Sequence, residues 1–264
     1  LCDLQLHWLM SMLEWIQHWG SGWLSLSAYQ QQMLFWGLTV WFIWRFTPVV
    51  IKRELGLLLL AVCGLLFAGC ESEPGWRVDM LDIGQGLSVL VTQGHRALLF
   101  DTGDAYPGGY NMADAAIFPM LEYRGVQQLD YLVVSHRDKD HAANWQRIYQ
   151  KYPQAHIVSS AKLNAETQIC QRWQQWDWGQ LQLTILSPQN SSGGDINEDS
   201  CVLRISDGNH SVLLTGDVQR QAEAELTRLP ASLLRSQILS SPHHGSRSSS
   251  SLEFIAAEIG RAHV

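Results

Sequence analysis

The chain has 264 residues, of which 46% are hydrophobic and 16% are charged. Its length suits one domain of ordinary size and a smaller segment beside it. The formal net charge of -7 argues against a nonspecific electrostatic grip on nucleic acid over the whole surface. Any contact with DNA would therefore need a local basic patch or bound metal ions. Five cysteines are too few for a disulfide scaffold.

The first segment, residues 1–32, holds tryptophans among polar residues, and Leu9, Leu13, Ile16 and Trp19 have helical spacing. This pattern is typical of an interfacial helix, because Trp favours the headgroup level of a membrane. A piece of soluble core fits the pattern equally well.

Residues 33–70 contain two apolar runs, separated by the basic sequence Lys52-Arg53. The second run is shorter than the roughly 20 residues of a membrane span, but neighbouring residues can extend it. We expect two membrane helices, with the basic turn on the cytoplasmic side and the rest of the chain outside it. The sequence Phe67-Ala68-Gly69-Cys70 also resembles the end of a lipoprotein signal, with Cys70 as the lipidated residue. The apolar run before Lys52 favours the membrane helices.

The two ends of the chain suggest truncation. The chain begins with Leu1 rather than Met, and Glu258-Ile-Gly-Arg-Ala-His-Val264 is what a sequencing adapter read in frame would encode. We therefore expect a sequence truncated at both ends, with a non-native tail at 258–264. Residues 71–75 form a linker in this interpretation, and residues 76–257 form a soluble domain.

Alternating and continuous apolar patterns predict the elements of that domain. The predicted strands are 89–91, 97–100, 131–134, 181–186, 202–205, 212–214 and 238–240, and the predicted helices are 112–123, 142–152 and 219–229. Cys170 and Cys201 are the only cysteines in the domain, and such pairs often form disulfides outside the cytoplasm, so we expect a bond between them.

Four side chains that can bind metal follow the apolar strand 131–134, namely His136, Asp138, Asp140 and His141. Open α/β sheets place ligand sites at the carboxyl ends of strands. Residues two apart in extended backbone point the same way, so His136 and Asp138 can share one ion. A turn could aim Asp140 and His141 at a second ion. The alternative is a solvated polar loop without a site. Such a loop would not explain why two histidines stand on either side of two aspartates.

This cluster resembles the metal signature of the metallo-β-lactamase superfamily. One stretch before the cluster and two stretches after it add to the resemblance. They are Phe100-Asp101-Thr102-Gly103, Leu213-Leu214-Thr215-Gly216-Asp217 and Ser241-Pro242-His243-His244-Gly245-Ser246. The stretch Leu81-Asp82-Ile83-Gly84-Gln85-Gly86 narrows the resemblance to ComEC-type DNA internalisation proteins of natural competence. The resemblance covers residues 76–257 strongly and 33–70 loosely. It implies an α/β fold, the αββα metallo-β-lactamase sandwich, preceded by membrane helices.

The resemblance implies two divalent metal ions, Mn²⁺ or Zn²⁺, bridged by Asp217. The first ion would take His136, Asp138 and Asp217, and the second would take Asp140, His141, Asp217 and one of His243 and His244. An Asp in place of a second His makes the first site harder and shifts its preference modestly toward Mn²⁺. The candidate catalytic residues are Asp140, His243 and His244, because the histidine that binds no metal could contact phosphate or protonate a leaving oxygen.

Three further carboxylates are candidates for supporting roles. Asp82 and Asp101 would lie behind the metal ligands and orient them. The superfamily often supplies a third histidine to the first metal near residues 197–199, where this chain has only Asp199 as a substitute. The first site would then be one protein ligand short. The usual Gly-Gly after the metal signature is also replaced, here by Ala142-Ala143-Asn144.

The implied function is a metal-dependent phosphodiesterase or nuclease domain of a DNA uptake channel, on the extracytoplasmic side of the inner (cytoplasmic) membrane. The implied partners are DNA, the membrane, other competence proteins and a second copy of the chain. One alternative is a different metallo-hydrolase on a lipoprotein anchor, acting on a lactone, a thioester or a choline phosphodiester. Another is a noncatalytic module that guides DNA.

Overall fold

The computed structural model describes residues 28–46, 48, 56, 75–189, 197–258 and 262–263. Within these residues, helix α2 (Ala28–Phe46) is the one element before the domain, and no described helix is long and apolar enough to cross a membrane. The expected membrane helices in 33–70 are therefore not supported where the chain is described. The rest of that segment (including Cys70), residues 1–27 and residues 71–74 of the linker lie outside the described residues.

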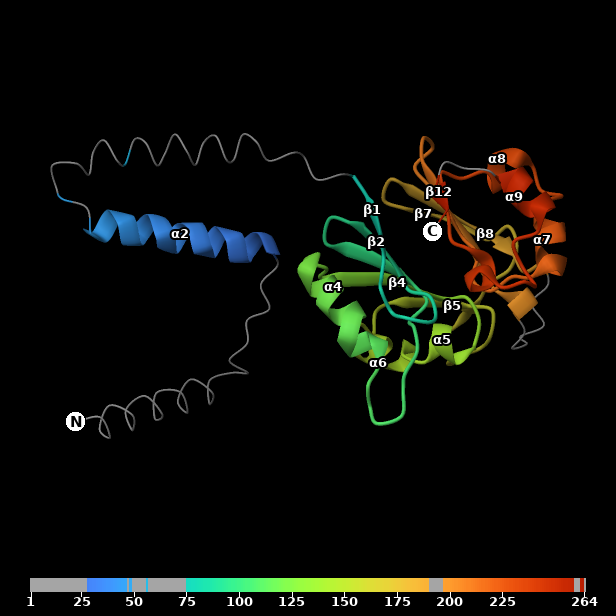
Figure 1. Ribbon diagram of the computed structural model, residues 1–264, viewed down its shortest axis with the longest axis horizontal. Helices are drawn as coiled ribbons and strands as arrows, with labels where there is room; N and C mark the ends of the chain where they lie inside the picture. The colour runs from blue at the N-terminus through green and yellow to red at the C-terminus, as the bar shows by residue number, and fades with distance from the viewer. Residues whose placement is uncertain are drawn as a thin grey trace. The chain divides into compact units, whose positions relative to one another are not determined.

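The domain is built on two six-stranded sheets (Figure 1). The first sheet has the order β1-β2-β3-β4-β5-β6. Its strands are β1 (Arg77–Met80), β2 (Val89–Gln93), β3 (Arg96–Phe100), β4 (Gln128–Val134), β5 (His156–Ser159) and β6 (Gln168–Ile169). The second sheet has the order β12-β11-β10-β9-β8-β7. Its strands are β7 (Gln175–Trp178), β8 (Leu181–Ser187), β9 (Val202–Ser206), β10 (Ser211–Leu214), β11 (Ile238–Leu239) and β12 (Ala262–His263).

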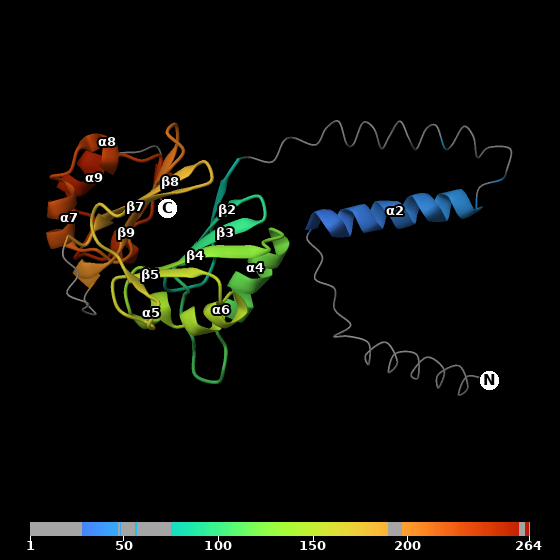
Figure 2. The ribbon, with the colours of Figure 1, turned by 180° about the vertical axis from the view of Figure 1, so that it is seen from behind.

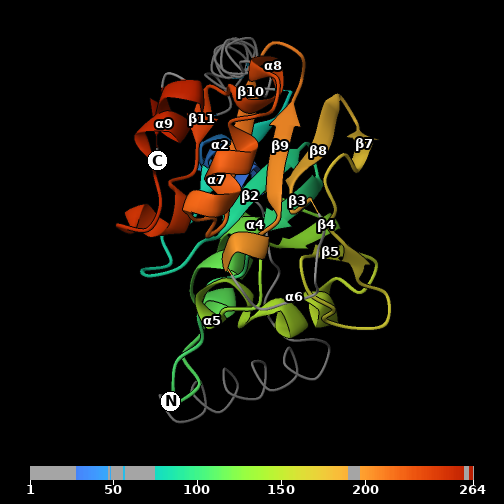
Figure 3. The same ribbon diagram turned by 90° about the vertical axis from the view of Figure 1, so that its right-hand side faces the viewer.

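Helices cover the outer faces of both sheets (Figures 1 and 2). The first sheet carries the π-helix η1 (Ala113–Ile117), α4 (Phe118–Tyr123), α5 (Lys139–Ala142) and α6 (Trp145–Lys151). The second sheet carries α7 (Arg220–Leu226), α8 (Ala231–Leu234) and α9 (Leu252–Glu258). Two 3₁₀ turns, η2 (Asn197–Asp199) and η3 (Pro242–Gly245), lie in loops. The second helical layer and the second sheet face the viewer in Figure 3.

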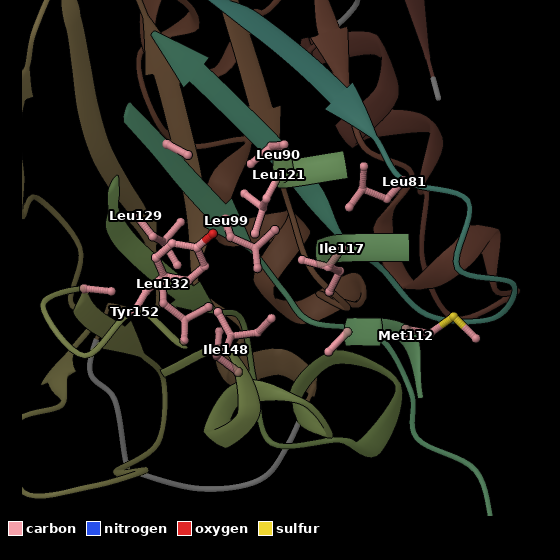
Figure 4. Close-up of a cluster of buried hydrophobic side chains, with 14 of the residues drawn as sticks. Leu81, Leu90, Leu99, Met112, Ile117, Leu121, Leu129, Leu132, Ile148 and Tyr152 are labelled. Carbon is pink, nitrogen blue, oxygen red and sulfur yellow. The ribbon is translucent and has the colours of Figure 1, made fainter. Parts of the chain in front are cut away.

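Three separate clusters of buried side chains show that the domain has four layers. Successive residues of a strand point to opposite faces of its sheet. On β3, Ala97 and Leu99 pack under the helices of the first sheet, in the cluster drawn in Figure 4, whereas Leu98 and Phe100 pack between the sheets. On β10, Leu213 packs under α7 to α9. The order helix, sheet, sheet, helix agrees with the expected αββα sandwich.

Parallel strand pairs bring the sequence motifs to one edge of the sandwich. Strands β3 and β4 are parallel, with Phe100 paired to Val133, so the loops after both strands begin side by side. Strands β10 and β11 are also parallel, with Leu213 paired to Leu239. The loops that carry the four motifs therefore all follow the carboxyl ends of their strands, where α/β folds place ligand-binding loops.

A disulfide joins Cys170 to Cys201, and both residues are buried between the sheets. Cys170 donates its backbone N–H to Ser159 of β5, and Cys201 donates to the carbonyl of Ser135. The bond therefore links the far strands of the first sheet to the start of β9, next to the loop of the metal motif.

Residues 258–264, expected as a non-native tail, are described in part. Glu258 ends α9 with a buried side chain that accepts a hydrogen bond from Ser236. Ala262–His263 form β12, which pairs in parallel with β11.

Candidate metal centre

Asp217 lies at the middle of the cluster, three residues after the end of β10, and its side chain is only 5% exposed. Its two carboxylate oxygens face two different groups of side chains. The Oδ1 atom is 3.0 Å from Nε2 of His141 and 3.5 Å from Nε2 of His244. The Oδ2 atom is 3.7 Å from Nε2 of His243 and 4.0 Å from Nε2 of His136. Asp217 therefore has the position of a bridging ligand.

The first group, which we name the Asp140 side, consists of Asp140, His141, His244 and the Oδ1 atom of Asp217. One possible ligand atom from each residue lies within 4.8 Å of all the others. The Oδ2 atom of Asp140 is 3.7 Å from His141 Nε2 and 3.5 Å from His244 Nε2. Two carboxylates and two imidazoles that converge in this way are the donor set of a divalent metal ion.

The second group, the His136 side, consists of His136, Asp138, His243 and the Oδ2 atom of Asp217. Nε2 of His136 is 3.4 Å from Oδ2 of Asp138, whose side chain is 49% exposed. His243 lies on this side because its Nε2 faces Oδ2 of Asp217. His243 is therefore the candidate for the protein ligand that the sequence left missing at this site.

The two adjacent histidines reach different oxygens of Asp217 because the backbone turns sharply at η3. His243 and His244 both have left-handed backbone conformations, with φ angles of 47° and 52°. This region is uncommon for residues other than glycine and costs of order 1 kcal/mol for each. Hydrogen bonds hold the turn, since Ser249 Oγ donates to the carbonyl of Pro242 and the N–H of Ser246 donates to the carbonyl of His243. Non-glycine residues held in this region often belong to functional sites.

Asp101 lies behind His141 and is fully buried. Its Oδ2 atom is 2.8 Å from Nδ1 of His141, and its carboxylate accepts hydrogen bonds from the backbone N–H and the hydroxyl of Ser135. An Nδ1–H that donates to this carboxylate leaves Nε2 of His141 as the atom directed at Asp217. Asp101 therefore has the geometry of an orienting carboxylate behind a metal-binding histidine.

Two glycines allow the loops to approach one another closely. A Cβ atom on Gly86 would lie 2.2 Å from the carbonyl oxygen of Asp140, and a Cβ on Gly216 would lie 2.7 Å from Cβ of Ser135. Both glycines also have positive φ angles, which side chains rarely adopt. The Gly84-Gln85-Gly86 stretch thus packs against the metal loop, and the Asp217 loop packs against Ser135.

Burial and neighbouring side chains shift the pKa values of several groups in the cluster. Burial lowers the pKa of His136, so this imidazole is neutral, as a metal ligand must be. Burial also opposes a charge on His141, but the carboxylates of Asp101 and Asp217 outweigh it and raise the pKa of His141 to about 10. A hydrogen bond to His244 lowers the pKa of Asp140 to about 2. A bound cation would take the place of the proton on His141.

The residues present fit divalent metal ions. Nε2 of His136 is buried and makes no hydrogen bond within the described residues, although its Nδ1 atom is 3.0 Å from Ser135 Oγ. A buried nitrogen without a partner is costly unless something else satisfies it. This atom points toward Asp138 and Asp217, where a metal ion would satisfy it.

The other two predicted supporting residues are Asp82 and Asp199. Asp82 has an exposed side chain, because strand-like alternation buries its neighbours Leu81 and Ile83 instead. Asp199 ends the turn η2 and is not one of the four residues whose donor atoms converge on the Asp140 side. The residue of η2 that reaches the centre is Asn197, whose Nδ2 atom is 3.4 Å from Nε2 of His243.

Asn144 is a positioning residue that the sequence did not reveal. It belongs to the Ala142-Ala143-Asn144 segment that replaces the usual Gly-Gly, it is 2% exposed, and its side-chain amide donates to the carbonyls of Thr102, Gly103 and Asp104. It thereby ties the segment after Asp101 to the segment after His141. The sequence did offer one signal for this role, a polar residue at a place where the family usually has glycine.

The αββα fold and the cluster centred on Asp217 together are those of a metallo-β-lactamase-type protein. A comparison of the sequence with protein families agrees. Residues 81–261 match the metallo-beta-lactamase superfamily, to which the chain belongs.

Comparison with curated proteins narrows the family. Recombination protein 2 of Haemophilus influenzae is 36% identical over 80% of this chain, and Competence protein ComA of Neisseria gonorrhoeae is 38% identical over 79%. The uncharacterized protein YcaI of Escherichia coli is 32% identical over 91%. These relatives confirm the resemblance to ComEC-type competence proteins. The chain spans 26%, 30% and 31% of the lengths of Recombination protein 2, ComA and YcaI, respectively.

Proposed function

We propose that this domain is a metal-dependent phosphodiesterase that cleaves DNA during uptake by a ComEC-type competence protein. The observation that carries the proposal is the position of Asp217, which presents one oxygen to each of two groups of metal-binding side chains. The relatives named for recombination and competence support DNA as the substrate.

The assignment of ligands follows the two sides of Asp217. Asp140, His141, His244 and the Oδ1 side of Asp217 would hold one divalent ion, Mn²⁺ or Zn²⁺. His136, Asp138, His243 and the Oδ2 side of Asp217 would hold the other. Both histidines of the late motif are ligands in this assignment, so neither remains free to protonate a leaving oxygen.

Two such ions, when bound, supply a hydroxide at neutral pH and stabilise the charge that develops on a phosphodiester. The chain's own contribution is geometric. Asp101 fixes the orientation of His141, Asn144 fixes the loop that carries Asp101, and the turn at His243 and His244 directs one imidazole to each oxygen of Asp217. Positioning of this kind accounts for much of the rate in phosphoryl transfer.

The domain acts on the extracytoplasmic side of the cytoplasmic membrane in this proposal, as part of a longer, membrane-bound protein. Other competence proteins and a second copy of the chain are its proposed partners. DNA transport is not part of the proposal for this chain, because the chain spans less than a third of the length of each relative described above.

The test is cleavage of labelled single-stranded and double-stranded DNA by the chain. It is run without metal, with Mn²⁺ and with Zn²⁺, beside the variant Asp140→Ala. Cleavage that requires metal and disappears in the variant supports the proposal. Two bound metal ions without cleavage would indicate another hydrolysed substrate, such as a lactone or a choline phosphodiester. DNA binding with neither metal nor cleavage would indicate a guiding module.

A further inference from the structure

A basic and aromatic groove adjoins the metal centre in a chain of net charge -7. It consists of two adjoining pockets of about 440 and 330 Å³. The first is lined by Arg137, Lys139 and Lys162, together with the half-buried Trp145, and the second is lined by Tyr106, Tyr110 and Arg147. The pockets share Ala143 and Gln146, so they form one continuous surface.

The groove is positive although the chain is acidic. Four cationic side chains line it, and no carboxylate does so among the described residues. Two of the cations have carboxylate partners beside the groove, since Lys139 pairs with Asp104 and Arg147 pairs with Asp114. Lys162 is exposed and makes no hydrogen bond or ion pair in the described part of the chain. A groove of this charge fits a polyanion.

The aromatic part of the groove is a hairpin loop that follows β3 and projects beyond α6 in Figure 1. An isolated bridge between Ala105 and Asn111 closes the hairpin, and the N–H of Tyr106 donates to the carbonyl of Tyr110. Tyr106 and Tyr110 are 37% and 60% exposed, and the centroids of their rings are 5.8 Å apart. Lys139 Nζ lies 5.6 Å from the centre of the Tyr106 ring, which joins the aromatic part to the basic part.

The groove is coupled to the metal centre through the chain. Arg137 and Lys139 alternate with Asp138 and Asp140, so each cation is about 3.8 Å, from Cα to Cα, from a metal ligand of the same loop. The side-chain amide of Asn144 donates to Asp104 at the base of the hairpin. Two of the cations that line the first pocket therefore belong to the same loop as His136, Asp138, Asp140 and His141.

We propose that this groove binds single-stranded nucleic acid and guides it to the metal centre. Cations follow the phosphates, and the exposed tyrosines stack on unpaired bases, the combination that recognises single strands without sequence preference. A duplex offers no unstacked base to the tyrosines. The inference rests on the proposed function for the role of the centre, but binding by the groove requires no metal ion.

The test is fluorescence anisotropy of a labelled single-stranded oligonucleotide, with EDTA present so that cleavage plays no part. The double variant Tyr106→Ala/Tyr110→Ala should bind about tenfold more weakly or worse, because stacking on each base is lost. Lys162→Glu should also weaken binding and should lower the dependence of log K on log salt by about 0.7 for the lost phosphate contact. Tyr123→Ala and Arg228→Glu, at exposed positions outside the groove, are the matched controls and should bind like the wild type.

Three results would overturn the inference. They are unchanged binding in both groove variants, equal weakening in the controls, and tighter binding of duplex than of single strands by the wild type. Absence of single-strand binding by the wild type would also overturn it, even if metal-dependent cleavage persisted. In that case the proposed function would stand without the groove. Binding that depends on the groove, without any cleavage, would support the inference and contradict the nuclease.

Discussion

The two sides of Asp217 differ in how completely the protein builds them. On the Asp140 side, four donor atoms lie within 4.8 Å of one another, and Asp101 supports His141 from behind. On the His136 side, the distances to Asp217 are 3.7 and 4.0 Å, and Asp138 is half exposed. A preorganised donor set binds more tightly than one that must still contract. On the proposed assignment of ligands, we therefore expect a tighter ion on the Asp140 side and a weaker one on the His136 side.

The largest effect should come from removing the residue that both sides share. Asp217→Ala should lower DNA hydrolysis by about 10³-fold or more, because several kcal/mol of transition-state stabilisation depend on correctly held cations. Initial rates at saturating metal would measure the loss. Asp177→Ala, at an exposed position of β7, is the control. Hydrolysis that survived in Asp217→Ala would mean that the reaction does not use this centre.

Separate removal of the two histidines tests the assignment of sides. His244→Ala should lose the tighter ion and His243→Ala the weaker one, so each variant should retain one ion of the two. Metal analysis and calorimetric titration would measure number and affinity, with His210→Ala, an exposed histidine, as the control. If His243→Ala bound two ions as tightly as the wild type, His243 would not be a ligand.

The support behind one side can be weakened without removing a ligand. Asp101→Asn should lower the affinity of the Asp140-side ion by about 10- to 100-fold, since outer carboxylates orient metal-binding histidines and raise their basicity. Titration with Mn²⁺ would show whether the loss is confined to the tighter ion. Equal loss at both ions would indicate a general loosening of the fold, and circular dichroism of the variant would detect it.

A close backbone contact on the Asp140 side should matter for stability. Gly86→Ala should lower the free energy of unfolding by about 1–3 kcal/mol, because its φ is positive and the new Cβ would meet the carbonyl of Asp140. Gly94→Ala is a matched control, since Gly94 also has a positive φ but faces open space. Thermal unfolding of both variants would separate the cost of a positive φ, which both share, from the cost of the contact with the carbonyl of Asp140. Equal destabilisation would remove the case for close packing at Gly86.

The smallest effect lies away from both sides, at Asp207. Hydrogen bonds from the backbone N–H of His210 and the indole of Trp76 lower the pKa of this carboxyl. Because the pKa is lower in the folded state, the ionised carboxyl stabilises the fold at pH values above the unfolded pKa of about 3.9. This stabilisation is lost as the pH falls through the folded pKa. Asp207→Asn should therefore cost about 1 kcal/mol at neutral pH and progressively less below about pH 4. Urea unfolding across this range would test the sign, and metal binding should not change.

Most of the framework could be predicted from local pattern. The predicted strands at 89–91, 97–100 and 131–134 lie within β2, β3 and β4, because their apolar residues are buried on both faces. The helix predicted at 112–123 forms as a π-helix followed by α4. Strand β7 was missed, because its sequence Gln175-Trp-Asp-Trp178 has only one fully buried residue. Strand β5 and helices α8 and α9 were also missed, since short elements give weak periodic signals.

The sequence by itself determined the family, the metal-binding residue types and the alternation that divides each strand between two cores, because these depend on residue identity and spacing. The tertiary structure decided which side chains meet. It placed His243 and His244 on opposite oxygens of Asp217 through two left-handed residues, left the side chain of Asp82 exposed, and brought Asn144 and Asn197 into place. Such contacts depend on the paths of loops between distant strands, and no local pattern records the direction in which a loop turns its side chains.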